Sequence, residues 1–119
     1  MFTAHLQGLL DRAPDAVSVT LMGFDGIAIE TCDAAHSASF DPQAAAIELG
    51  SVVTQLRRVS ADLGTGDVAE LSLETQGMTT VLRPITDEYF LAVALRPGAN
   101  IGKARYLLRV IAPKLQGEL

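Results

Sequence analysis

Residues 89–95 read YFLAVAL and residues 100–116 read NIGKARYLLRVIAPKLQ, and these two stretches decide the fold. The first is nearly all apolar, which predicts a central strand that is buried on both faces of a sheet. The second opens with Asn100, a favoured helix cap, and continues with apolar residues at helical spacing. It predicts a helix over 101–116 in which Pro113 kinks or frays the final turn. The inner stripe of that helix is Ile101, Ala104, Leu107, Leu108, Ile111 and Leu115.

Two further strands are predicted directly upstream of residue 89. Residues 68–75 alternate apolar and polar side chains, and Gln76-Gly77 then supplies a turn. Residues 78–85 form the next strand, with Pro84 near its end, where a missing backbone donor is tolerated. With residues 89–95, these strands make a three-stranded antiparallel meander, because the loops between them are short.

The N-terminal half predicts a helix, a hairpin and a second, longer helix. Residues 2–13 have an apolar helical face, and residues 16–22 and 27–31 are strands joined by the Asp25-Gly26 turn. After a polar loop, Asp41 caps a helix that Pro42 begins and that ends at Gly64. The whole order, helix–hairpin–helix–meander–helix, predicts an α/β (α+β) fold with helices packed on an antiparallel sheet.

Length and composition fit a single domain over residues 1–119. Hydrophobic residues make up 49% of the 119 positions, which is enough for a core at this size. Charged residues make up only 19%, so we expect part of the apolar surface to be covered in an oligomer.

Charge and hydropathy exclude several classes of function. A net charge of −5 argues against nucleic-acid binding and against docking on anionic lipid. No apolar run approaches the roughly 20 residues of a membrane helix, and the first residues do not resemble a signal peptide. We therefore expect a cytoplasmic protein without membrane insertion.

The chain lacks the patterns that carry catalysis or cofactor binding. Residues 64–69, GTGDVA, match a dinucleotide motif in letters, but a helix precedes them and a strand follows, so we interpret them as a helix stop and a turn. Cys32 and His36 could be a nucleophile and a base, but no third group is placed to orient them. No cluster of ligands suggests a metal. We expect no enzyme activity, no cofactor and no metal site.

The long helix over 42–63 carries three stripes. Ala45, Leu49, Val52, Leu56, Val59 and Leu63 are predicted to rest on the sheet, whereas Glu48, Ser51, Gln55, Arg58 and Asp62 are predicted to face water. A third stripe, mostly of small residues, contains Ala46, Gly50, Val53, Arg57 and Ala61.

Gly50 is the informative member of the third stripe, because a glycine inside a helix costs about 1 kcal/mol relative to alanine. Two explanations are open. Either a second helix approaches closely along this stripe, which predicts that Gly50→Leu disrupts a dimer and leaves the monomer folded, or Gly50 relieves crowding against the loop before Phe40. The strand over 68–75 is a second candidate contact, since it is predicted to lie at a sheet edge.

Three segments resemble the Roadblock / dynein light chain family, including its bacterial MglB-like members. They are the strand–Asp-Gly–strand hairpin over 17–29, the long helix with GSVVTQLRRVSADL over 50–63, and the final strand followed by NIGKAR over 100–105. The resemblance implies an αββαβββα sandwich. In it a five-stranded antiparallel sheet carries the long helix on one face and the two terminal helices on the other.

The resemblance also implies a function. Family members pair through their second helices and third strands, and prokaryotic members often regulate small Ras-like GTPases without binding nucleotide themselves. Mapped onto this chain, the dimer interface would contain Ala46, Gly50, Val53, Arg57, Ala61, Val68, Leu71 and Leu73. The partner-binding residues would be Glu48, Ser51, Gln55, Arg58 and Asp62.

Three functions are compatible with these features. The first is a non-enzymatic homodimeric adaptor or regulator that docks a small Ras-like GTPase. The second is a structural adaptor subunit of a motor, polarity or signalling complex with no GTPase partner. The third is a small-molecule sensor. It is the weakest of the three, because no cluster of convergent polar residues marks a cavity. An exposed arginine of the 57–58 pair could act as an arginine finger, but we favour a solvated helix face as the explanation for the pair.

Overall fold

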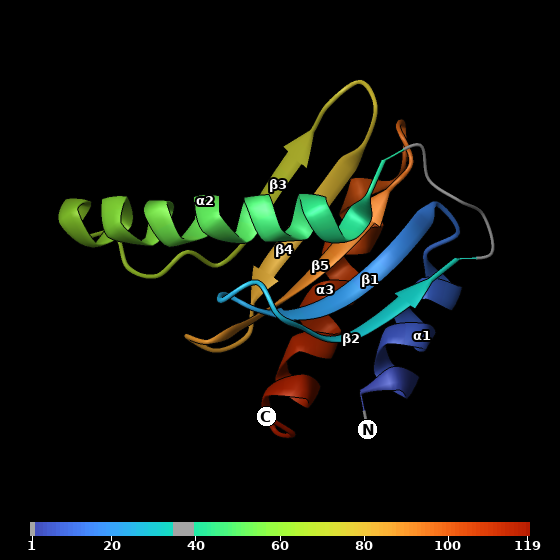
Figure 1. Cartoon of the computed structure of the whole chain (residues 1–119), viewed down its shortest axis with the longest axis horizontal. Helices are drawn as coiled ribbons and strands as arrows, with labels where there is room; N and C mark the ends of the chain where they lie inside the picture. Colours follow the sequence, from blue (N-terminus) through green and yellow to red (C-terminus); the bar gives the residue numbers. More distant parts are fainter. Residues whose placement is uncertain (1, 35–39) are drawn as a thin grey trace.

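The computed structural model describes residues 2–34 and 40–119 and shows eight elements (Figure 1). In chain order they are α1 (Thr3–Arg12), β1 (Ala16–Gly23), β2 (Ala28–Asp33), α2 (Pro42–Leu63), β3 (Leu71–Glu74), β4 (Thr79–Pro84), β5 (Tyr89–Leu95) and α3 (Ile101–Gln116). His36 and most of the loop predicted over 32–40 lie outside the described residues.

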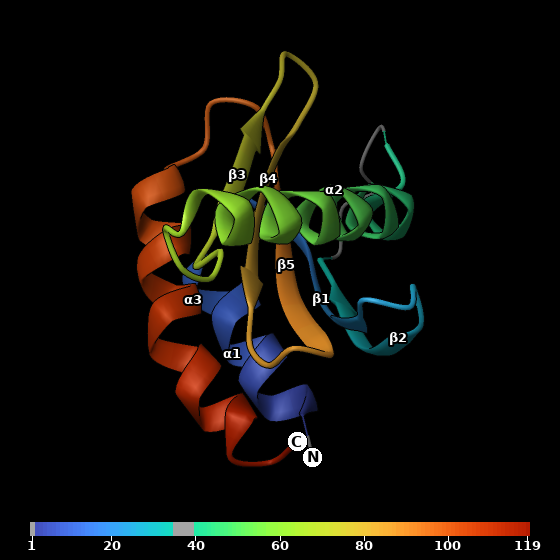
Figure 2. The same cartoon turned by 90° about the vertical axis from the view of Figure 1, so that its left-hand side faces the viewer.

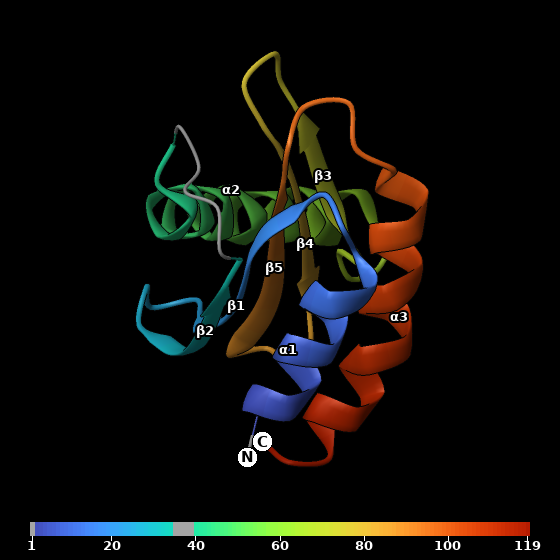
Figure 3. The same ribbon diagram turned by 90° about the vertical axis from the view of Figure 1, so that its right-hand side faces the viewer.

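The described strands form one antiparallel sheet in the order β2-β1-β5-β4-β3. Figure 2 shows α2 lying across one face of this sheet, and Figure 3 shows α1 and α3 together on the other face. The predicted α+β architecture is therefore confirmed, including the separation of the long helix from the two terminal helices. The strand β3 lies at a sheet edge, as predicted.

Helix caps fix the ends of the two longest helices where the sequence predicts them. The Asp41 carboxylate accepts hydrogen bonds from the backbone N–H groups of Gln43 (3.0 Å) and Ala44 (3.2 Å). Gly64 ends α2 in the left-handed conformation, with φ of 68°, which a glycine adopts without strain. The Asn100 side chain accepts from the Lys103 N–H and starts α3. Residues 64–69 are thus a helix stop, as interpreted from the sequence.

The sheet separates two apolar cores. The larger one lies between the sheet and the terminal helices, and includes Leu6, Leu9, Leu108 and Leu115, all of which are buried. The smaller one lies under α2 and contains Met22, Ala46, Leu49, Val53, Leu82, Phe90 and Ala92. The stripe predicted for α3 is confirmed, because its members are buried except for Ile101, which packs against the edge of the larger core.

Three boundaries differ from the sequence prediction. The strand predicted over 68–75 is shorter, because residues before Leu71 are unpaired and Glu70 instead forms ion pairs with Arg83 and Arg105. The second hairpin strand lies slightly later than 27–31, with a register irregularity between Leu21 and Met22. The helix α3 continues through Pro113 to Gln116, so its final turn is not frayed.

The cap of α2 gives the first prediction. Asp41→Ala removes the acceptor of two helix N–H groups and should lower the free energy of unfolding by about 1 kcal/mol. Urea denaturation followed by circular dichroism measures the change. Asp62→Ala, on the exposed side of the same helix, is the matched control and should leave stability nearly unchanged. Equal losses for both variants would show that Asp41 does not cap the helix.

Candidate interaction surface on the long helix

Only the N-terminal half of α2 is seated on the sheet. All of its buried residues lie between Ala46 and Val53, and none of the later residues is buried. In Figure 1 the C-terminal end of the helix extends beyond the edge of the sheet at β3. At 22 residues the helix is about 33 Å long, and the part after Val53 contains no buried residue.

The packing of Gly50 on the sheet sets the rotation of α2 about its own axis. A Cβ atom built on Gly50 would lie 2.9 and 3.0 Å from two ring carbons of Phe90, closer than a side chain tolerates. Phe90 is 1% exposed and stands on the central strand β5. Glycine is therefore required at position 50 because the helix backbone rests directly on this ring.

This contact bears on the predicted dimer seam. Ala46 and Val53 are 1% and 0% exposed and, with Gly50, face the sheet of their own chain. They therefore offer almost no surface to a second molecule, and their assignment to the dimer interface stays a prediction. The alternative, that Gly50 relieves crowding against the loop before Phe40, concerns a segment that lies largely outside the described residues. Among the described residues, the atoms nearest to a Cβ at position 50 belong to Phe90.

Arg57, the next member of that stripe, is bound within the chain. Its guanidinium donates to the carbonyl oxygens of Asp87 (3.0 Å) and Thr86 (3.3 Å) in the β4–β5 turn. It also lies 4.0 Å from the centroid of the Phe24 ring, which packs against Phe90 at 4.9 Å. Arg57 therefore fastens α2 to two turns of the sheet. Ala61, one turn further on, is exposed.

The stripe that was predicted to rest on the sheet lies instead along one flank of the helix. Of its members only Leu49 is buried, and Ala45 and Leu56 are partly covered. Val52, Val59 and Leu63 are 40%, 50% and 70% exposed. We call these three residues the apolar flank. Both stripes of α2 are apolar or small, so helical spacing alone could not decide which one faces the sheet. The feature that indicates the sheet-facing side is the contact between a glycine of α2 and a phenylalanine of β5.

The polar stripe was predicted correctly. Its five members are exposed and form a second surface beside the apolar flank: Glu48, Ser51, Gln55, Arg58 and Asp62. Ile47, which is 45% exposed, lies on a different side of the helix, near the β1–β2 turn.

The strand β3 adds an edge to this region. Among the described residues β3 pairs only with β4, so its other side presents backbone groups along Leu71–Glu74 that no described strand binds. Leu73 is 39% exposed, whereas Leu71 and Val68 are partly buried against the core under α2. Of the three β3-region residues predicted for the interface, Leu73 is the most accessible.

The described residues show no arrangement typical of catalysis. Cys32 is buried, and burial together with the nearby Glu30 and Asp33 carboxylates raises the pKa of its thiol, so the thiol stays protonated and weakly nucleophilic. Across residues 2–34 and 40–119, no three histidine, cysteine or acidic side chains are grouped to hold a metal ion. Within the same residues, no helix has the length and apolar character needed to cross a bilayer.

An α+β domain of this order, with one long helix alone on one sheet face, defines a class that includes Roadblock/LC7 domains. The chain superimposes on the Roadblock/LC7 domain from Streptomyces avermitilis with a TM-score of 0.81 at 18% identity, over 97% of this chain and 94% of that one. It superimposes on the gliding protein MglB from Thermus thermophilus with a TM-score of 0.84 at 15% identity, over 96% and 84%.

A third structure, MglC from Myxococcus xanthus, is 40% identical over 99% of this chain and 98% of that one, with a TM-score of 0.71. The chain belongs to the Roadblock/LC7 family. A further similar structure, described as MglB with tetrameric arrangement, has a TM-score of 0.84 at 16% identity, over 96% and 84%. No protein-family model matches the chain, and no curated protein sequence matches it.

The Gly50–Phe90 contact gives the second prediction. Gly50→Ala should destabilise the monomer by about 1–3 kcal/mol through overpacking, although alanine is the better helix former. In the double variant Gly50→Ala/Phe90→Leu the smaller side chain relieves the clash, so the two effects should be strongly non-additive in urea denaturation. Ser51→Ala is the neighbouring exposed control. A Gly50→Ala protein as stable as the wild type would mean that α2 is seated differently.

Proposed function

We propose that this chain is a non-enzymatic cytoplasmic adaptor that pairs with a second copy of itself through α2 and docks a small Ras-like GTPase on the paired helices. The observation that carries the proposal is the projecting half of α2, which holds an exposed apolar flank and contains no buried residue. A helix in this position leaves apolar surface in water unless another molecule covers it.

A second copy is well suited to cover the apolar flank. In a two-fold dimer the same surface of both chains meets, so Val52, Val59 and Leu63 would pack against their own copies. The unpaired edge of β3, with Leu73 exposed beside it, would lie next to this contact and could join the two sheets. The tetrameric arrangement described for an MglB of the same fold supports self-association in proteins of this shape. The proposed interface thus differs from the one predicted from the sequence, because it uses the apolar flank in place of the stripe that contains Gly50.

The polar stripe is the proposed partner surface. Glu48, Ser51, Gln55, Arg58 and Asp62 are exposed and lie beside the apolar flank, so pairing of two flanks would bring two polar stripes together. The combined surface would be larger than either chain offers alone, which matters because specific interfaces bury about 800 Å² per partner. Its mixed charges favour recognition of a folded protein over nucleic acid. The choice of a Ras-like GTPase rests on the family resemblance.

The third prediction tests self-association. The double variant Val59→Glu/Leu63→Glu places charges in the proposed seam and should weaken association by more than about hundredfold, because a buried unpaired charge costs several kcal/mol. Sedimentation equilibrium over a micromolar range measures the constant. Ile47→Glu is the matched control, since Ile47 is similarly exposed but lies outside the apolar flank. A wild-type chain that stays monomeric, or an Ile47→Glu variant that dissociates equally, would contradict the proposed seam.

The fourth prediction tests the partner. Affinity capture from an extract of the protein's own cells, followed by mass spectrometry, should recover a small Ras-like GTPase. Arg58→Glu should lose the GTPase and keep self-association, whereas Lys103→Glu at the start of α3 should keep both. Recovery of partners without any GTP-binding protein would favour the structural-adaptor alternative. Equal recovery by Arg58→Glu would show that the polar stripe is not the docking surface.

A further inference from the structure

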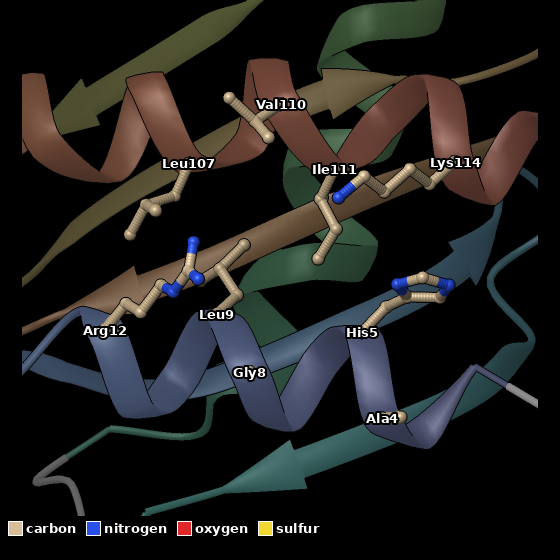
Figure 4. Close-up of a pocket in the computed structure, with 9 residues that line it drawn as sticks. All are labelled: Ala4, His5, Gly8, Leu9, Arg12, Leu107, Val110, Ile111 and Lys114. Atoms are coloured by element: carbon tan, nitrogen blue, oxygen red, sulfur yellow. The ribbon is translucent and has the colours of Figure 1, made fainter.

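A groove lies between α1 and α3, on the face of the sheet opposite α2, and it has no part in the proposed pairing or GTPase docking. Its volume is about 200 Å³. Figure 4 shows Leu9, Leu107 and Ile111 pointing into the space between the two helices, so its floor is apolar. The space suits one or two apolar side chains of a bound molecule and is smaller than the usual site for a drug-sized ligand.

The groove exists partly because α1 has a glycine in its middle. Gly8 lines the groove, and a Cβ atom built on it would meet no atom within 4 Å. The packing of this chain therefore does not require glycine at position 8, in contrast to Gly50. A glycine inside a helix costs about 1 kcal/mol relative to alanine. An occupant that approaches the helix backbone closely would account for that cost.

Basic side chains stand at both ends of the groove, although the chain as a whole has a net charge of −5. Arg12 lies at one end, and His5 and Lys114 lie at the other (Figure 4). Among the described residues, Arg12 and Lys114 form no ion pair, whereas His5 lies 3.3 Å from the Glu118 carboxylate.

We propose that this groove binds an acidic segment of a partner protein, in which one or two apolar residues lie between two carboxylates. The apolar residues would fill the space above Gly8 and contact Leu9 and Ile111. The carboxylates would pair with Arg12 at one end and with Lys114 at the other. Because no residue of α2 contributes, this site can be tested separately from the pairing of two chains.

The apolar floor and the two separated cationic ends favour a peptide segment over other anionic ligands. A single small carboxylate would satisfy only one end. A nucleic acid or an anionic membrane would be opposed by the net negative charge of the chain and needs a broad basic surface, which three side chains around one groove do not provide.

The test is selection of a displayed library of random twelve-residue peptides on the folded wild-type protein. We expect enrichment of sequences in which two acidic residues flank one or two apolar residues. Synthetic peptides of the enriched sequences should then bind the Gly8→Leu variant at least about tenfold more weakly, because leucine fills the groove. Gln7→Leu adds the same side chain on the exposed side of α1 and should bind as the wild type does.

Charge reversal tests the ends of the groove. Arg12→Glu and Lys114→Glu should each weaken peptide binding about tenfold and reduce its dependence on salt concentration. Arg109→Glu, on α3 but outside the groove, is the matched control. Circular dichroism of each variant checks that it is folded.

The proposal would be overturned by no enrichment, by enrichment of peptides that are not acidic, or by equal binding by the wild-type and Gly8→Leu proteins. Binding of a free dicarboxylate as tight as that of the peptides would also overturn it, since the site would then be a small-molecule site. The double variant Val59→Glu/Leu63→Glu should bind the peptides normally, so failure of the proposed self-association leaves this result unaffected.

Discussion

The contact between the α2 backbone at Gly50 and the ring of Phe90 determines how the outer surface of the molecule is arranged. Because the ring stands on the central strand β5, it holds α2 at a fixed rotation. Phe24 packs against the same ring, and Arg57 lies over Phe24 while it binds two carbonyl groups of the β4–β5 turn. These linked contacts direct the apolar flank of α2 away from the sheet. The exposure of the flank is therefore a consequence of how the opposite, buried side of α2 packs on the sheet.

The two faces of the sheet differ in how completely they are covered. The terminal helices bury an extensive core, whereas α2 is seated by four residues between Ala46 and Val53 and by Arg57. Apart from the contacts of Arg57, the half of α2 after Val53 therefore gains little from its own chain. Most helical stability in proteins comes from packing of an apolar face, so a partner on the apolar flank would stabilise this half as well as assemble the complex. Folding and assembly are expected to be coupled in this region.

The sequence predicted elements well where a local signal was sufficient, but it did not predict which side of α2 faces the sheet. The bounds of β5, α2 and α3 follow from an apolar run and from Asp41, Gly64 and Asn100, each of which acts on its own neighbours. The rotation of α2 depends on Phe90, which is forty residues away in the chain, and both candidate stripes are apolar enough to face a sheet. The late start of β3, at Leu71, likewise depends on Glu70 and its ion pairs with Arg83 and Arg105, which the alternation of apolar and polar residues does not reveal.

The two helical glycines show why composition alone cannot assign a surface. Gly50 and Gly8 each interrupt a helix, and propensity treats them alike. At Gly50 the ring of Phe90 occupies the space a side chain would need, so the glycine serves the fold. At Gly8 the space is open and lies between basic side chains, so the fold itself gives no reason for the glycine. We attribute the glycine at position 8 to the proposed occupant of the groove, which would approach the backbone of α1 closely.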